Sequence, residues 1–226
     1  MNRVFITGDK HGDFYPIINF IEKYELGYGD FIIILGDMGL YWRKDGKDAK
    51  AFIQMYEKDY EVNLMFIDGN HENFDRLKQI PVGENGLSKI SEHIYYLPRG
   101  CAFELCGKKY LCMGGADSID KFRREEHFTW WKDEQITEED IKGIKGNYDY
   151  VLTHCCPTSV FNKNKFILCT LAGMIDEDIV DHTSEDRLEE MSKNIQFKHW
   201  LFGHYHTDVQ LDDKFRCLYN NFIEIE

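Results

Sequence analysis

Five large apolar residues, 31–35 (FIIIL), stop abruptly at Gly36 and Asp37. A run this short, rich in β-branched residues and closed by glycine and an acid, is typical of a strand buried on both faces. Similar runs lie on either side of it along the chain, separated by stretches whose apolar side chains have helical spacing. The other runs are residues 4–7 and 63–67, and the helical stretches are residues 15–24 and 47–60. This alternation predicts parallel β-α-β units in the first seventy residues.

The rest of the chain has a different pattern, with shorter strands closer together. Residues 94–96, 102–105 and 110–113 are close enough to favour antiparallel pairing. Residues 184–195 form a plausible helix with Ser184 as a candidate N-cap. Later strands are predicted at residues 150–152, 198–202, 215–219 and 222–225. We therefore expect one α/β domain, residues 1–226, with a mixed sheet system and a possible lid or insertion at about residues 114–146.

Composition narrows the class of partner. The formal net charge of −13 disfavours binding to a long nucleic acid, because an acidic surface repels phosphates. The chain has no apolar run of about eighteen residues that would span a membrane, and its first residues read as a strand instead of a signal peptide. Seven cysteines without a CxxC pair indicate reduced, mostly buried thiols. These features predict a cytoplasmic protein, and they do not define its oligomeric state.

Polar residues follow five of the predicted strands. They are Asp9 and His11, Asp37, Asn70 and His71, His154, and finally His204 and His206. A single histidine at a strand end is usually a hydrogen-bonded surface residue, and each motif alone occurs by chance. The combination is different, because the carboxyl ends of parallel strands meet at one edge of a sheet, where ligands bind. Side chains two residues apart on an extended chain also point to the same side.

The types of side chain in this set indicate a metal site. Carboxylate, imidazole and carboxamide groups without a thiolate suit Mn²⁺ best, and also Fe, Zn²⁺ or Ni²⁺. All of these residues except His71 are candidate ligands, and these seven are too many for one tetrahedral ion. They are sufficient for two ions if one carboxylate is shared.

The ordered blocks GDKHG (8–12), GDMG (36–39), GNHE (69–72), TH (153–154) and GHYH (203–206) resemble those of the calcineurin-like metallophosphoesterases. The resemblance implies two packed mixed sheets flanked by helices, with two divalent ions and hydrolysis of a phosphate ester by a hydroxide that bridges them. It places one ion on Asp9, His11 and His206, and the other on Asn70, His154 and His204. Asp37 would bridge both ions, and His71 would act on the substrate.

Two positions depart from patterns in this superfamily. Many members have a second acid, linked to the catalytic histidine, where this chain has Leu40. Asp68, Glu72 or Asp75 could replace that acid as the partner of His71. The arginines typical of protein Ser/Thr phosphatases are also absent, since Tyr41 and Asp68 occupy their positions. The chain therefore resembles a small bacterial or phage-type phosphoesterase.

The predicted insertion contains cations and aromatic side chains. Its candidate substrate-binding residues are Arg123, Arg124, Trp130 and Trp131, with Lys121 nearby. One interpretation is a lid whose arginines bind a phosphate and whose tryptophans cover a flat group. The other is a peripheral segment with core tryptophans and solvated charges.

Three functions are compatible with these observations. The first is a phosphatase or phosphodiesterase acting on a small phosphorylated substrate, such as a nucleotide or cyclic diester. The second is a nuclease or nucleic-acid end-processing phosphodiesterase, which the net charge disfavours. The third is a non-catalytic scaffold, which the complete ligand set disfavours.

Overall fold

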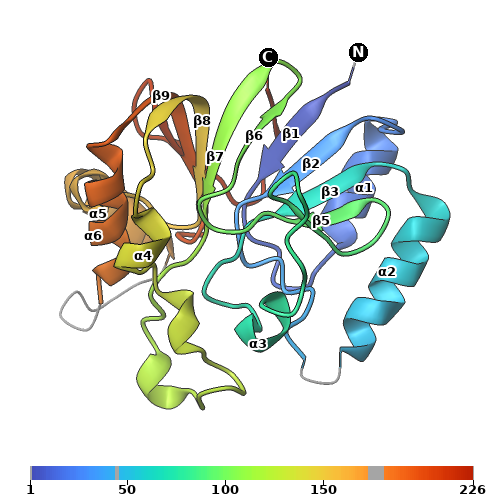
Figure 1. Cartoon of the computed structure of the whole chain (residues 1–226), viewed down its shortest axis with the longest axis horizontal. Helices are drawn as coiled ribbons and strands as arrows, with labels where there is room; N and C mark the ends of the chain where they lie inside the picture. Colours follow the sequence, from blue (N-terminus) through green and yellow to red (C-terminus); the bar gives the residue numbers. More distant parts are fainter. Residues whose placement is uncertain (1, 44–45, 173–180, 226) are drawn as a thin grey trace.

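Two six-stranded mixed sheets, packed face to face, form the centre of the protein (Figure 1). The computed structural model describes residues 2–43, 46–172 and 181–225. In order across the first sheet the strands are β12, β1, β2, β3, β5 and β4, and across the second β10, β11, β9, β8, β7 and β6. The mixed, two-sheet architecture expected from the sequence is confirmed.

The first sheet is built around three parallel strands, β1 (Val4–Thr7), β2 (Phe31–Ile34) and β3 (Asn63–Phe66). Helix α1 (Tyr15–Lys23) connects β1 to β2, and α2 (Lys47–Asp59) connects β2 to β3, as predicted. The edge strands are β12 (Ile223–Glu224) and β4 (Ser88–Lys89), and β5 (Ile94–Tyr96) lies between β3 and β4. The expected antiparallel pairing of β5 with its successors is wrong, because β5 pairs in parallel with β3 and antiparallel only with β4.

The second sheet begins with a hairpin of β6 (Ala102–Leu105) and β7 (Lys108–Met113), which is antiparallel as predicted. Parallel strands β8 (Gly146–Thr153), β9 (Ile195–Phe202) and β11 (Phe215–Cys217) follow β7 across the sheet. The antiparallel strand β10 (Val209–Gln210) forms the far edge. Both sheets thus present parallel strands whose carboxyl ends can supply a common site.

Strand β2 and the residue after it contribute side chains to two separate hydrophobic cores. Ile32 and Ile34 pack against α1 and α2, whereas Ile33 and Leu35 lie in the core between the two sheets. This is the period of two that strand geometry imposes, with both faces buried. Phe52 and Tyr56 of α2 are also buried.

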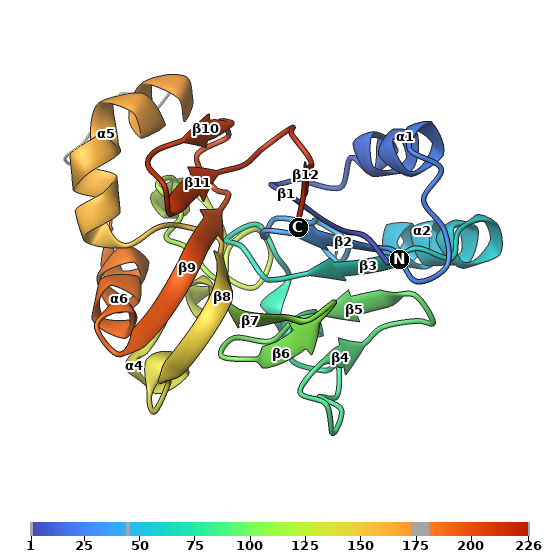
Figure 2. The same cartoon turned by 90° about the horizontal axis from the view of Figure 1, so that it is seen from above.

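The second sheet has its own layer of helices, formed by α5 (Thr158–Ala172) and α6 (Thr183–Ser192), with the short α4 (Glu138–Ile141) beside them (Figure 2). The molecule is therefore a four-layer sandwich. The prediction of Ser184 as an N-cap is wrong: His182 occupies that position, and the Ser184 hydroxyl accepts from the Ile136 backbone N–H at 3.1 Å. Helix α5 was not predicted, since its apolar residues do not keep to one face.

The predicted insertion, at about residues 114–146, is a largely irregular connection between β7 and β8 with the short helices η1 (Lys121–Arg123), η2 (Lys132–Glu134) and α4. Arg99 fastens it to the first sheet. Its guanidinium lies 2.7 Å from Asp68 Oδ2 and donates to the backbone oxygens of Asp133, Glu134 and Gln135. A further short helix, α3 (Phe74–Leu77), follows β3. Within the described ranges, the helices lack the length and apolar character of a bilayer-spanning segment.

Candidate active site

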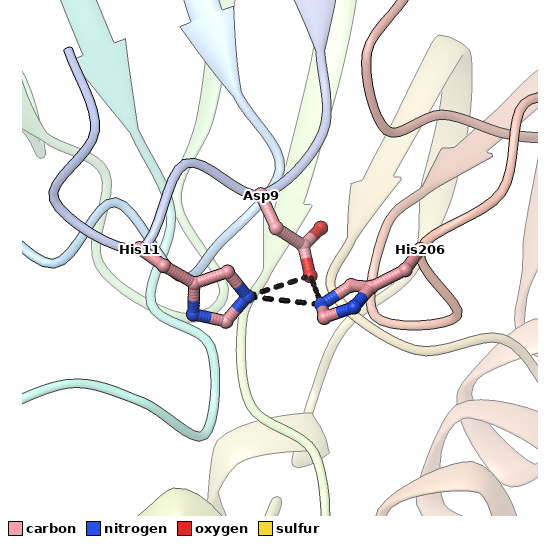
Figure 3. A group of neighbouring side chains, drawn as sticks. All are labelled: Asp9, His11 and His206. Atoms are coloured by element: carbon pink, nitrogen blue, oxygen red, sulfur yellow. Dashed lines mark hydrogen bonds and ion pairs between the residues drawn. The ribbon is translucent and has the colours of Figure 1, made fainter. Parts of the chain in front are cut away.

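The polar residues predicted from the five strand ends converge where the carboxyl ends of β1, β2 and β3 face those of β8 and β9. They form two groups of three side chains joined by one carboxylate. The first group is Asp9, His11 and His206 (Figure 3). Asp9 Oδ2 lies 3.3 Å from His206 Nε2 and 3.9 Å from His11 Nε2, and the two imidazole nitrogens are 2.9 Å apart.

The second group is Asn70, His154 and His204. Asn70 Oδ1 lies 3.1 Å from His154 Nε2 and 3.1 Å from His204 Nδ1. His154 Nδ1 is 2.6 Å from the Leu35 backbone oxygen, which can only accept a hydrogen bond. Nδ1 therefore carries a proton, and Nε2 is the nitrogen that can present a lone pair to an ion.

Asp37 lies between the two groups. Its Oδ2 is 3.8 Å from His11 Nε2 and 3.4 Å from His154 Nε2. Its other oxygen, Oδ1, accepts a hydrogen bond from the His71 backbone N–H at 2.7 Å. One carboxylate oxygen is thus held by the chain while the other reaches both groups.

These residues fit a pair of divalent cations. Ligand atoms about 2.1 Å from one ion and at right angles to each other are about 3 Å apart, close to the spacing within each group. Although burial disfavours a charged imidazole, the carboxylates of Asp37 and Asp9 raise the pKa of His154 to about 10. The site therefore stabilises positive charge at its centre, which metal ions would supply.

The local backbone brings the ligands together in a way that extended geometry does not. His11, Asp37, His204 and His206 all have positive φ, between 45° and 67°. The prediction that an extended chain aligns residues two apart is therefore wrong: tight left-handed turns aim these side chains. Such backbone is costly for residues other than glycine and tends to occur at functional sites.

Gly36 shows how closely the strands approach one another here. Its φ is +89°, and a Cβ at this position would lie 2.2 Å from His154 Nδ1. Only glycine therefore allows the end of β2 to pass the His154 ring.

His71 lies beside the first group, among aromatic rings and a guanidinium. Its ring centroid is 5.1 Å from that of His11 and 5.5 Å from that of Trp42, and Arg124 Nη2 is 3.0 Å from His71 Nε2. Burial, together with the positive charge of Arg124, lowers the pKa of His71 to about 4 in spite of the nearby Asp37. His71 is therefore a neutral imidazole near pH 7.

The three acids considered as partners of His71 have other contacts. Asp68 pairs with Arg99, and Glu72 Oε1 accepts from the Met38 backbone N–H at 2.8 Å. Asp75 accepts from Trp131 Nε1 at 2.9 Å. Related proteins have an acid at the position of Leu40, and that acid is linked to the catalytic histidine. Among the contacts described for the His71 ring, Arg124 takes the place of that acid.

The insertion contributes one arginine to the cavity beside the two groups. This cavity has a volume of about 230 Å³, and its lining includes Arg124 and Asp120 together with His71, Asn70 and Asp37. Asp120 Oδ1 holds the Arg124 Nε at 2.7 Å. Arg123 is exposed and packs on Phe122 instead.

The two predicted tryptophans are placed differently from the arginine. Trp131 is buried, donates to Asp75 and packs against Trp42, so its surroundings are those of a core residue. Trp130 is half-buried, and neither tryptophan is among the described lining residues of the cavity. Trp42 was not predicted, although it follows directly in the GDMGLYW stretch.

A sequence profile described as "Calcineurin-like phosphoesterase" matches residues 2–208. The chain belongs to the calcineurin-like phosphoesterase family. Members of this family are hydrolases of phosphate esters that depend on a dinuclear metal centre. The family and the enzyme class expected from the sequence are thereby confirmed, and the two joined groups of side chains are candidate metal-binding clusters.

Several curated relatives are lariat debranching enzymes. Lariat debranching enzyme A of Xenopus laevis is 25% identical over 236 residues, which is 91% of this chain and 43% of the relative. The enzymes of Drosophila melanogaster and Homo sapiens are 25% and 23% identical, over 90% and 91% of this chain. The phosphoesterase thus spans less than half the length of these relatives.

Comparison with solved structures finds a protein serine/threonine phosphatase from Saccharomyces cerevisiae with similarity to human phosphatase PP5. It aligns with a TM-score of 0.37 and 14% identity, over 96% of this chain and 67% of that one.

Proposed function

We propose that this phosphoesterase hydrolyses a phosphate mono- or diester with two divalent ions, Mn²⁺ first among them. The observation that carries the proposal is the position of Asp37 Oδ2, within 3.8 Å of a ligand nitrogen in each group. Asp9, His11 and His206 would hold one ion, Asn70, His154 and His204 the other, and Asp37 both. When bound, such ions polarise phosphoryl oxygens and lower the pKa of a water molecule to near neutrality.

Arg124 is the residue of the chain that would bind the phosphate directly. It lines the cavity, and Asp120 fixes its guanidinium beside His71. A guanidinium matches the geometry of phosphate oxygens and keeps its charge at any working pH.

The role of His71 follows from the same contact. In the related pattern a histidine paired with an acid can donate a proton to the leaving oxygen. Here the pKa of His71 is low, because of burial and of Arg124. A guanidinium only donates, so Nε2 of neutral His71 accepts from Arg124, and we assign the positive charge near the leaving oxygen to Arg124.

The substrate class rests on the size and charge of the site. A cavity of about 230 Å³ is smaller than most pockets for whole small-molecule ligands, so it suits a phosphate and the atoms next to it. The net charge of −13 favours a small phosphorylated compound, such as a nucleotide, over a long polyanion.

A second candidate is hydrolysis of an RNA phosphodiester at a branch or an end. It is supported by the similarity to lariat debranching enzymes over about nine tenths of this chain. The low identity and the acidic composition leave it second.

Both candidates are tested by one substrate panel with added Mn²⁺. It contains p-nitrophenyl phosphate and its bis ester, 2′,3′- and 3′,5′-cyclic nucleotides, dinucleoside polyphosphates and a short branched RNA. We expect turnover of at least one small ester that is abolished in Asp37→Asn and reduced in His71→Ala. If the wild type and both variants are equally inactive throughout, and fewer than one ion binds per chain, the results would support a non-catalytic scaffold instead of an enzyme.

A further inference from the structure

Ser118 lies in the insertion, in the sequence GGADS, and is buried between the metal groups and a second buried polar residue, Glu134. Its hydroxyl lies 3.0 Å from Asn70 Nδ2 and 2.7 Å from Glu134 Oε2. Its backbone N–H donates to Glu134 Oε1 at 2.7 Å. The GGADS stretch thus connects directly to one candidate metal ligand, which none of the roles described above explains.

The hydrogen bonds that link Glu134, Ser118 and Asn70 have a defined direction. An ionised carboxylate only accepts, so Glu134 takes both the N–H and the O–H of Ser118. The hydroxyl oxygen is then left to accept from Asn70 Nδ2. With its nitrogen committed to Ser118, Asn70 must direct Oδ1 to the opposite side, where His154 Nε2 and His204 Nδ1 each lie 3.1 Å away.

We propose that Ser118, held by Glu134, is a positioning residue that fixes the Asn70 carboxamide with its oxygen toward the second ion. The inference rests on the proposed dinuclear function. A carboxamide has two ends of nearly equal size but opposite polarity. Rotated by half a turn, Asn70 would present an NH₂ group to a cation and lose it as a ligand.

Asn70 needs such a partner more than Asp9, Asp37 or His154 does. The carboxylates of Asp9 and Asp37 have two equivalent oxygens, so rotation does not change what they present. His154 is already oriented by the Leu35 backbone oxygen. Outer partners of this kind typically change metal affinity by about 10–100-fold when they are removed.

The same contact links metal binding to the insertion. Ser118 and Glu134 bracket the segment that carries Arg124, and this segment lies in yellow-green below the strands in Figure 1. Docking of one segment therefore orients a ligand of the second ion and also delivers the arginine that faces the phosphate.

A calorimetric titration with Mn²⁺ alone, at pH 8 where Glu134 is ionised, tests the inference on four variants. Ser118→Ala removes the acceptor of Asn70 Nδ2, Asn70→Ala removes the ligand, and the double variant removes both. Ser88→Ala is the matched control, because Ser88 is also a fully buried serine but lies on edge strand β4. Thermal unfolding of each metal-free variant checks that the fold is retained.

We expect Ser118→Ala to weaken binding of one ion by at least about tenfold and to leave the other ion unaffected. The double variant should bind no more weakly than Asn70→Ala, because Ser118 acts through Asn70. Ser88→Ala should bind both ions like the wild type. Two ions bound with unchanged affinity in Ser118→Ala, or additive losses in the double variant, would overturn the inference. A wild type that binds no second ion would instead contradict the proposed function itself.

Discussion

Asp37 is the residue through which the two groups of candidate ligands meet, and its two oxygens have separate tasks. One accepts from the His71 backbone N–H, and the other faces His11 and His154. Although burial disfavours its charged form, the adjacent imidazole of His154 lowers the pKa of Asp37, so it is ionised throughout the neutral range. The surrounding chain is thus arranged to keep a negative charge at the midpoint of the site.

Replacing Asp37 with Asn keeps the shape of the side chain and removes this charge. We expect kcat/KM to fall by about 10³-fold, or ~4 kcal/mol of transition-state stabilisation. His206→Ala should lose less, because His206 belongs to one group only. Steady-state kinetics at saturating Mn²⁺ measures both, and equal losses would show that the two groups do not depend on a common carboxylate.

Arg124 and Arg123 are adjacent in the chain and differ in every contact that matters for binding. Removal of a charged hydrogen-bonding partner of the phosphate costs about 2 kcal/mol, which is about a 30-fold loss of kcat/KM in Arg124→Ala. Arg123→Ala is the matched control and should stay within about twofold of the wild type, because its side chain is exposed and packs on Phe122. Steady-state kinetics on any ester that the enzyme hydrolyses compares the two variants, and a loss of kcat/KM confined to Arg123→Ala would contradict the assignment.

At the scale of elements, the insertion is joined to the sheets by buried polar contacts. Arg99 alone contacts Asp68, Asp140 and three backbone oxygens. Because Asp68 is wholly buried, it cannot exchange this partner for water. The docking of residues 114–146 therefore combines these directional contacts with the apolar packing of Ala116, Ile136 and Ile141.

Arg99→Met should lower the free energy of unfolding by about 3–5 kcal/mol, because it leaves the Asp68 carboxylate buried without its cation. Arg187→Met should cost less than about 1 kcal/mol, since its partners Glu138 and Glu190 are exposed. Urea denaturation of both variants measures the difference. Similar values for the two would mean that the Asp68 pair is worth no more than a surface pair.

The buried acid Glu134 gives this element a pH dependence. Burial raises the pKa of Glu134 to about 7, although its hydrogen bonds from Ser118 act in the opposite direction. Between its unfolded pKa of about 4.5 and this value, the folded protein binds more protons than the unfolded one, so the contribution of Glu134 to stability falls as pH rises. We expect the stability of the wild type relative to Glu134→Gln to decrease from pH 4.5 to 7.5. A flat difference in urea denaturation across that range would be contrary to this expectation.

Strand interiors and strand ends could be predicted from sequence because each has a local signature. The alternation of Ile32 to Leu35 between two cores follows from a period of two, and the candidate ligand residues follow from short motifs at strand ends. The parallel pairing of β5 with β3 and the contact of Ser118 with Asn70 depend on residues far apart in the chain. Arg123 and Arg124 have different contacts because of how η1 places the two side chains, and no local sequence pattern predicts this placement.

At the scale of the whole molecule, the candidate ligands come from both sheets. Asp9, Asp37 and Asn70 follow strands of the first sheet, whereas His154 and His204 follow strands of the second. Ions bound here would therefore connect the two halves of the sandwich across their common edge.

Metal removal should accordingly affect the stability of the whole fold. A ligand present at 100 times its dissociation constant stabilises the folded state by about 2.7 kcal/mol. We expect the melting temperature in Mn²⁺ to exceed that in EDTA by several degrees, and His154→Ala to reduce the difference. Differential scanning fluorimetry measures it, and equal melting temperatures in Mn²⁺ and EDTA would count against ions shared by the two sheets.

The positive φ values of His11, Asp37, His204 and His206 have a consequence for how such a protein changes over time. Without metal, each of these residues holds a backbone conformation that costs more free energy than it would for glycine or asparagine. A population selected only for heat resistance, in a chelating medium, should lose these four residues early. Activity and thermal stability therefore place opposite demands on these turns, and we expect the turns to be retained only where activity is selected.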